Sequence, residues 1–210
     1  MQLHLLPTSL ALLAVSHRAL ASPAVSTITR TATSPPVPTS TSFTSDSAFE
    51  TAMLAAHNFY RKEHNASALT WNSTSAKYAA SWAGNCVFKH SGGPTGENLA
   101  AGYTNASQGV DAWGLERESY DWAKPGFSEA TGHFTQVVWR NTTSVGCGRT
   151  ACEGRDDTPG FYVVCEYYPP GNVVGDGNRF FVDNVWRQVE GRDTDTVESG
   201  VTSFARGWGS

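Results

Sequence analysis

The order of apolar and polar positions predicts helices in the first two thirds of the chain and strands after them. The first helix opens on Ser47-Ala48-Phe49-Glu50, in which we expect the Ser47 hydroxyl to cap the helix and Glu50 to reach back from the third helical position. The apolar positions of this helix recur at helical spacing: Phe49, Met53, Ala56 and Tyr60.

Three more helices are predicted downstream. An alanine-rich stretch from about Thr74 to Gly84 indicates a helix that packs closely, and a third helix runs from about Val110 to Tyr120 with Trp113 facing inward. A fourth helix is centred on Phe134–Trp139.

Two strands follow these helices. Ser144–Thr150 is the first, and Phe161–Tyr168, which is rich in Val and aromatic residues, is the second. Helices that precede strands favour an α+β fold with helices packed on a mostly antiparallel sheet.

Segments of different composition flank this region. Residues 1–21 are typical of a signal peptide, with an apolar centre at 10–15 and a cleavage site at Ala19-Leu20-Ala21. Residues 22–45 are almost entirely Ser, Thr, Pro, Ala and Val, which predicts a disordered linker, either O-glycosylated or unmodified. We expect the folded domain over 46–190 and a flexible tail over 191–210, with no later segment apolar enough to cross a membrane.

Composition narrows the class of partner. Hydrophobic residues make up 40% of the 210 residues, charged residues only 16%, and the net charge is −4. The low charge suits a secreted protein, and the absence of a basic stretch argues against nucleic acid as a partner.

Export changes how the four cysteines are interpreted. An even number in an oxidising compartment predicts two disulfides, in any of three connectivities. A four-thiolate zinc site is the alternative, but the paired C-x-x-C spacing of such sites is absent. Four glycosylation sequons agree with export, at Asn65, Asn72, Asn105 and Asn141.

Two histidines and two glutamates are candidates for chemistry: His90, Glu97, Glu116 and His133. If they converge, they would make a site able to hold a divalent cation. Their spacing alone does not select them, because HExxH is absent and His57, His64, Glu63 and Glu118 are equally eligible.

Two other motifs of chemistry are also absent from the sequence: the serine hydrolase elbow (G-x-S-x-G) and a phosphate-binding loop.

An aromatic segment follows the third predicted helix. Tyr120, Trp122 and Phe127 surround Pro125-Gly126, which should end the helix and turn the chain. Large apolar groups on such a loop near water would cover a flat apolar ligand, whereas the alternative is a satellite core packed under the loop.

The chain resembles the CAP superfamily of cysteine-rich secretory, antigen 5 and pathogenesis-related 1 proteins, most of all its fungal members. The match covers roughly Ser47 to Val189 and rests on several motifs in order: Leu69-Thr70-Trp71-Asn72, His90-Ser91, Gly96-Glu97-Asn98-Leu99-Ala100, Trp113-x-x-Glu116-x-x-x-Tyr120, Gly132–Trp139, Tyr162–Tyr167 and Pro170-Gly171-Asn172. Glu166 departs from the family pattern, a change that we expect to matter little.

The resemblance implies a three-layer α-β-α sandwich with disulfides Cys86–Cys152 and Cys147–Cys165. It also implies that the His/Glu tetrad (His90, Glu97, Glu116 and His133) lines a central cleft that can bind zinc or magnesium, with no obligatory cofactor. A hydrogen-bonded polar cluster that organises the cleft is the alternative at these positions.

The resemblance further implies a secreted, non-catalytic protein that binds or exports sterols and sterol esters, with a role in virulence or defence and host or cell-wall components as further partners. The implied sterol-binding residues are Tyr120, Trp122, Pro125, Gly126 and Phe127. A separate fatty-acid groove is implied between two helices, at Met53, Ala56, Tyr60, Val137 and Val138, with ordinary helix packing as its alternative. Two other functions stay open: a metal-dependent hydrolase or protease that uses the tetrad, and a wall-associated structural glycoprotein.

Overall fold

The computed structural model describes residues 40–199, which lie in one compact unit. The predicted signal peptide, most of the predicted linker and the last residues of the predicted tail lie outside the described residues. The described elements are helices α1 (Thr41–Thr44), α2 (Asp46–Glu63), α3 (Ser73–Ala83), α4 (Ala106–Leu115), α5 (Gly132–Val137) and α6 (Arg179–Asn184), strands β1 (Thr70–Trp71), β2 (Gly96–Ala101), β3 (Ser144–Ala151) and β4 (Phe161–Tyr168), and short 3-10 turns η1 (Glu116–Ser119), η2 (Arg155–Asp157) and η3 (Asp176–Asn178).

The start of α2 differs from the predicted one. Ser45, not Ser47, is the N-cap, and its hydroxyl accepts from the backbone nitrogen of Ala48 at 3.4 Å. The chain before it is already ordered, because Phe43 of α1 is buried and its ring stacks on Phe161 at 4.4 Å. The folded region therefore begins about five residues before the predicted limit at residue 46.

The remaining helices lie where the periodicity placed them, with shifted ends. Asn105 caps α4 by accepting from the backbone nitrogen of Gln108, so this helix starts before Val110 and gives way to η1 after Leu115. α5 ends at Val137 rather than Trp139. These differences arise at termini, where capping contacts outweigh periodicity.

The sheet has the order β1-β3-β4-β2, with β3 and β4 close to their predicted bounds. β4 pairs antiparallel with both β3 and β2, and only β1 pairs in parallel, with β3. β2 was not predicted as a strand, because Gly96-Glu97-Asn98-Leu99-Ala100-Ala101 has few β-branched or aromatic residues. Its antiparallel pairing with β4 holds this segment extended although its residues have low β propensity.

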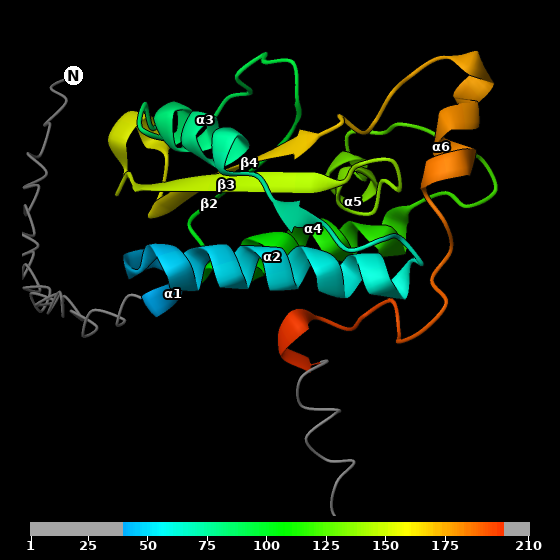
Figure 1. The fold of residues 1–210 in the computed structure, drawn as a ribbon, viewed down its shortest axis with the longest axis horizontal. Helices are drawn as coiled ribbons and strands as arrows, with labels where there is room; N and C mark the ends of the chain where they lie inside the picture. The colour runs from blue at the N-terminus through cyan, green and yellow to red at the C-terminus, as the bar shows by residue number, and fades with distance from the viewer. Residues whose placement is uncertain (1–39, 200–210) are drawn as a thin grey trace, which may run out of the picture. The chain divides into compact units, whose positions relative to one another are not determined.

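Helices cover both faces of this sheet, as Figure 1 shows, with α3 on one face and α2 and α4 on the other. The α3 layer lies close to the sheet, since a Cβ added at Gly148 would lie 2.1 Å from the backbone nitrogen of Ala80. The predicted α+β sandwich with a mostly antiparallel sheet is therefore confirmed.

Each helix layer has its own core. The larger core, between the sheet and the helices α2, α4 and α5, includes Met53, Trp113, Phe134 and Tyr167. The smaller core, under α3, includes Ala79, Leu99, Tyr162 and Val164. Both implied disulfides are present: Cys147–Cys165 joins paired positions of β3 and β4, and Cys86–Cys152 joins the segment after α3 to the end of β3.

The segment after residue 190 was predicted to be a flexible tail, and its first part packs on the domain instead. The buried Arg117 donates to the backbone oxygens of Arg192, Asp193 and Asp195. Val197 packs against the larger core. The folded region therefore extends past residue 190 through at least Val197.

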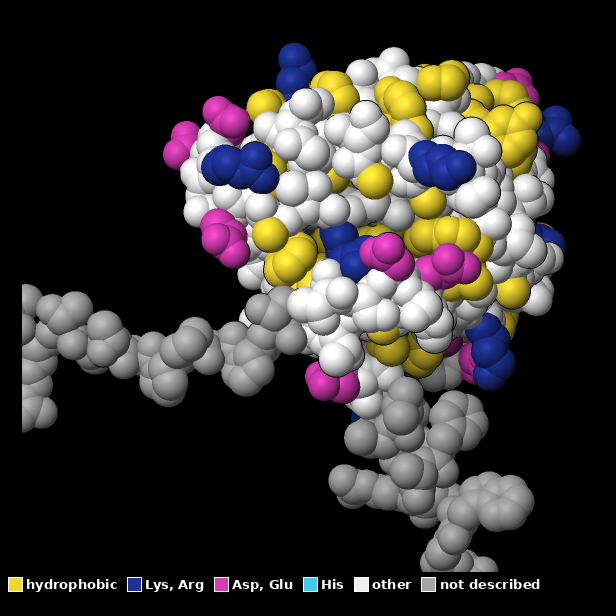
Figure 2. Space-filling view, turned by 60° about the vertical axis from the view of Figure 1, so that its left-hand side comes forward, with side chains coloured by type: hydrophobic (Ala, Val, Ile, Leu, Met, Phe, Trp, Pro, Cys, Tyr) yellow, Lys and Arg dark blue, Asp and Glu magenta, His cyan; other side chains and the backbone are white. Residues whose placement is uncertain are grey.

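The surface agrees with the low charge of the sequence. On the face that Figure 2 shows, basic and acidic side chains are scattered and mixed in sign. Within residues 40–199, no helix is both long and apolar enough to span a membrane.

Candidate functional site

The first histidine–glutamate pair of the tetrad lies at β2. Glu97 Oε1 accepts from His90 Nδ1 at 2.7 Å and from the backbone nitrogen of Ser91 at 2.9 Å. The Glu97 side chain is nearly buried, whereas the His90 side chain is 63% exposed. Glu97 thus fastens the loop that carries His90 to the strand.

The second pair joins η1 to the start of α5. Glu116 Oε1 accepts from His133 Nδ1 at 2.6 Å, and Glu116 Oε2 accepts from the backbone nitrogens of His133 and Phe134, both at 3.1 Å. Since a carboxylate only accepts, Nδ1 of His133 carries a proton, and Nε2 is the nitrogen left for another partner.

The two pairs do not make a single metal site as they stand. Among residues 40–199, no three His, Cys, Asp or Glu side chains converge closely enough to hold a metal ion. A carboxylate on Nδ1 is the arrangement that orients metal-binding histidines, but a site also needs several donors around one point. The tetrad therefore does not fit a preformed metal centre, and metal binding stays a prediction.

A cavity of about 430 Å³ opens beside the Glu116–His133 pair, between α4 and the edge strand β2. Its walls are mostly apolar and include Leu99, Trp113 and Pro159. Trp113 is fixed in place because its Nε1 donates to the backbone oxygen of Leu99 at 3.1 Å, and its ring stacks on that of His133.

Glu166 is a further functional candidate, although its departure from the family pattern predicted little effect. It pairs in register with Glu97, is 1% exposed, and accepts a hydrogen bond from the Thr95 hydroxyl. Burial and the neighbouring Glu97 carboxyl raise the pKa of Glu166 to about 8. Burial also acts to raise the pKa of Glu97, but hydrogen bonds, chiefly with Glu166 and Ser91, lower it overall. One proton therefore belongs to the pair at neutral pH.

A buried hydrogen-bonded chain supports the backbone of His133. Asn98 Nδ2 donates to the backbone oxygen of His133 and to the Tyr167 hydroxyl, both at 3.1 Å. That hydroxyl donates to His57 Nε2 at 2.7 Å, because His57 Nδ1 donates to the backbone oxygen of Met53. Burial lowers the pKa of His57 to about 4, so the imidazole is neutral. No spacing in the sequence predicts this hydrogen-bonded network, because it joins residues far apart along the chain.

The predicted sterol loop is a loop, but its aromatic residues do not all face water. Tyr120 is buried and Trp122 is half-buried, and their rings meet edge to face at 4.7 Å. The Tyr120 hydroxyl accepts from the backbone nitrogen of Gly126, which closes the loop. Pro125 is half-buried, and Phe127 is 51% exposed. The expectation of exposed aromatics is thus wrong for Tyr120 and holds best for Phe127.

The five residues of the implied fatty-acid groove are fully buried within the larger core: Met53, Ala56, Tyr60, Val137 and Val138. They therefore pack as ordinary helix contacts in this structure. A groove at this place would require α2 and α5 to separate.

The four sequons differ in their local structure. Asn65 and Asn141 are exposed, which suits glycan attachment. Asn72 and Asn105 are half-buried and cap α3 and α4 through their side-chain oxygens. Asn72 Nδ2, the atom that a glycan would occupy, also donates to the Ser144 hydroxyl at 3.4 Å.

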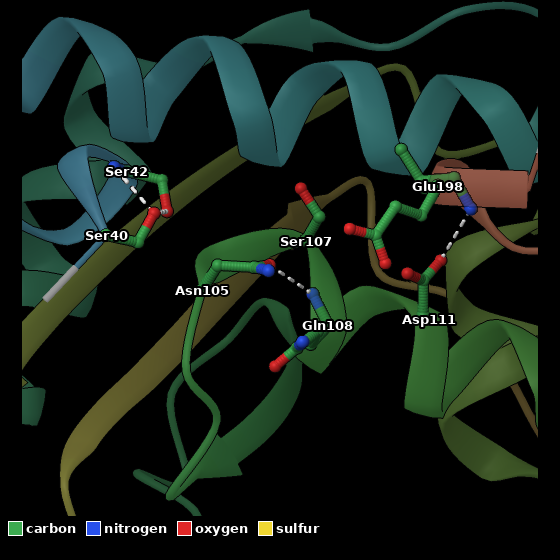
Figure 3. Close-up of a pocket in the computed structure, with 8 residues that line it drawn as sticks. Ser40, Ser42, Asn105, Ser107, Gln108, Asp111 and Glu198 are labelled. Atoms are coloured by element: carbon green, nitrogen blue, oxygen red, sulfur yellow. Dashed lines mark hydrogen bonds between the residues drawn. The ribbon is translucent and has the colours of Figure 1, made fainter. Parts of the chain in front are cut away.

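A second hollow, of about 410 Å³, lies between α1, α4 and the segment near Val197. Figure 3 shows that polar side chains line it and that several bond to neighbouring backbone, with Asn105 at the Gln108 nitrogen. Asp111 accepts from the backbone nitrogen of Val197 in the same way.

Comparison with known proteins agrees with this architecture. Residues 54–167 match the model of the cysteine-rich secretory protein family, CAP. The protein named Repressed by EFG1 protein 1, from Candida albicans, is 46% identical over 154 residues, which cover 68% of this chain and 55% of the relative. Protein PRY2 of Saccharomyces cerevisiae is 49% identical over 144 residues, which cover 65% of this chain and 41% of the relative. The chain thus spans about half the length of these relatives.

Solved structures show the same fold. The crystal structure of NaASP2 with Zn2+ matches with a TM-score of 0.53 and 25% identity, over 67% of this chain and 86% of that chain. The matched sequence model, the helix-covered sheet and the paired cysteines lead to one conclusion: the chain belongs to the cysteine-rich secretory protein (CAP) family.

Proposed function

We propose that this protein is a secreted, non-catalytic lipid-binding protein that takes up sterols at the loop of residues 120–127. The secretory family and the two disulfides support an extracellular location. The observation that carries the proposal is the anchored loop: Tyr120 and Trp122 hold its base, and Phe127 projects with 51% of its surface exposed. An exposed aromatic side chain on a fixed base offers a flat apolar contact to a sterol ring system.

The burial of Tyr120 and Trp122 determines how this proposal is tested. Trp122→Ala would remove core contacts with Phe134 as well as any ligand contact, so its loss of binding would be ambiguous. Phe127→Ser removes a half-exposed ring that lies beside Gly132 and is absent from the buried core. Tyr78→Ser is the matched control, because Tyr78 is a 43% exposed aromatic residue on α3, in the opposite helix layer.

The experiment is saturable binding of labelled cholesterol and ergosterol to the mature protein. We expect binding that weakens at least tenfold in Phe127→Ser and is unchanged in Tyr78→Ser. Absence of saturable sterol binding in the native protein would reject the proposal, and equal binding by both variants would reject the loop as the site.

The hydrolase alternative has no comparable support. It needs a metal-bound water held by several convergent donors, and the residues described provide two separate His–Glu pairs instead.

A further inference from the structure

We propose that the cavity beside His133 binds the hydroxyl end of an apolar alcohol, the chemistry that free sterols and long-chain fatty alcohols share. His133 Nε2 would accept the proton of the ligand hydroxyl, and the apolar walls would hold the hydrocarbon next to it. The inference rests on the proposed lipid binding but assigns a second site, distinct from the loop at Phe127.

The size and walls of the cavity fit such a ligand. Its volume of about 430 Å³ lies within the range of roughly 300–1,000 Å³ usual for small-molecule sites. Trp113 and Leu99 form the inner wall, and Phe88 and Tyr103 stand at its rim, 54% and 38% exposed. Exposed aromatic residues around an apolar hollow are costly in water, and a hydrocarbon that covers them recovers part of that cost.

The polar end of the cavity is oriented before any ligand arrives. Glu116 accepts from Nδ1 of His133, so in the imidazole form of the ring Nε2 presents a lone pair. Trp113 stacks on one face of the imidazole, and Asn98 holds the His133 backbone oxygen. This group therefore accepts a hydrogen bond with little reorganisation.

The same geometry selects among lipids. A fatty acid would bring its carboxylate close to Glu116 and to Asp157, another acidic residue in the cavity lining, and like charges repel. A sterol ester has no hydroxyl proton to offer to Nε2. A free alcohol is both neutral and a donor, so it matches the end of the cavity.

The test compares two ligands with the same dodecyl chain, 1-dodecanol and methyl dodecyl ether, in which a methyl group replaces the hydroxyl proton. Binding to the mature protein is measured by calorimetry in EDTA, so that no metal occupies His133. We expect saturable dodecanol binding, and ether binding about tenfold weaker because the hydrogen bond is lost. Equal affinity for the two would overturn the proposed role of His133.

A cavity-filling variant locates the site. Ala112 of α4 lines the cavity, and Ala112→Phe would occupy it. Ala55→Phe, at an exposed position of α2, is the matched control. We expect dodecanol affinity to fall at least tenfold in Ala112→Phe and to stay unchanged in Ala55→Phe. Unchanged affinity in a folded Ala112→Phe protein would overturn the assignment to this cavity.

The loop variant separates this inference from the proposed function. Dodecanol binding that persists in Phe127→Ser supports a second site, whereas its loss there would place the alcohol at the loop and overturn the inference.

If the native protein binds dodecanol at the cavity but no sterol, the sterol proposal fails and the cavity assignment stands. If it binds cholesterol but not dodecanol, and Ala112→Phe leaves cholesterol binding intact, the cavity assignment fails alone.

Discussion

Glu97 and Glu166 lie directly across from each other on β2 and β4, with their side chains at most 6% exposed on the face of the sheet that α3 covers. Glu166 Oε1 and Glu97 Oε2 are both buried without a hydrogen-bond donor from the described residues. Two such carboxyl groups are compatible at short range only when they share a proton. Burial first, and then the neighbouring Glu97 carboxyl, raise the pKa of Glu166 to about 8.

The first prediction concerns stability above pH 6.5. The native protein keeps a proton on Glu166 that the unfolded chain releases, so this stabilisation is complete below the ordinary pKa of Glu and is lost as pH rises through about 8. Between pH 6.5 and 8 the loss is on the order of 1–2 kcal/mol. Glu166→Gln should remove this slope in urea unfolding measured at several pH values, while the exposed Glu129→Gln should retain it.

Below pH 6.5 the pH dependence of stability has the opposite sign, because two histidines dominate it. The unfolding measurements on Glu166 are therefore made at pH 6.5 and above. Burial lowers the pKa of both His57 and His64 to about 4, so these rings are neutral in the native state where the unfolded chain protonates them. Their stabilisation is lost as pH falls from about 6.5 towards 4. A native protein whose stability is flat from pH 6.5 to 8 would contradict the shared proton at Glu166.

The second prediction concerns Arg117. Its buried guanidinium pairs with Glu63 and donates to three backbone oxygens of residues 192–195. Arg117→Met would leave the Glu63 carboxylate buried without its cation, a change that costs about 3–5 kcal/mol. Urea unfolding measures this loss, and adding Glu63→Gln to the variant should recover part of it.

Arg179→Ala is the control for this variant, because Arg179 is 73% exposed in its side chain and pairs with Asp183 at the surface. Its effect should stay below about 1 kcal/mol. A similar cost for Arg117→Met and Arg179→Ala would mean that the segment of residues 192–195 is not held as described.

The third prediction concerns the contact between α3 and the sheet. A Cβ at Gly148 would lie 2.1 Å from the backbone nitrogen of Ala80, so Gly148→Ala must push the helix away from β3. We expect destabilisation of about 1–3 kcal/mol or more in thermal and urea unfolding. Gly84→Ala is the matched control, since its added Cβ would come no closer than 3.3 Å to neighbouring atoms and its backbone is already helical. Equal stability of the two variants would contradict this close approach.

Much of the fold follows from local pattern. The apolar period of Met53, Ala56 and Tyr60 gave α2, and the Val and aromatic content of residues 161–168 gave β4. β2 was not predicted, because Gly96–Ala101 is extended through pairing with β4 and not through the β propensity of its own residues.

The candidate site was less predictable from the sequence. Motif order identified His90, Glu97, Glu116 and His133 as a set, but it could not show that they form two pairs on separate elements. Glu166 looked like a minor departure, because its effect depends on the strand register that places it opposite Glu97. The contact between His57 and Tyr167 could not be predicted either, since it joins residues 110 positions apart.

The sequence by itself determined the helices, the late strands and the family, because these depend on residue order along short segments and on motifs in series. It also supplied the four cysteines, whose two pairings came from the family resemblance. Only the tertiary structure decided that Tyr120 is buried while Phe127 is exposed, that Glu97 lies opposite Glu166, and that His133 lines a largely apolar cavity. These properties depend on packing and strand register between distant segments, which bring together side chains that no local pattern relates.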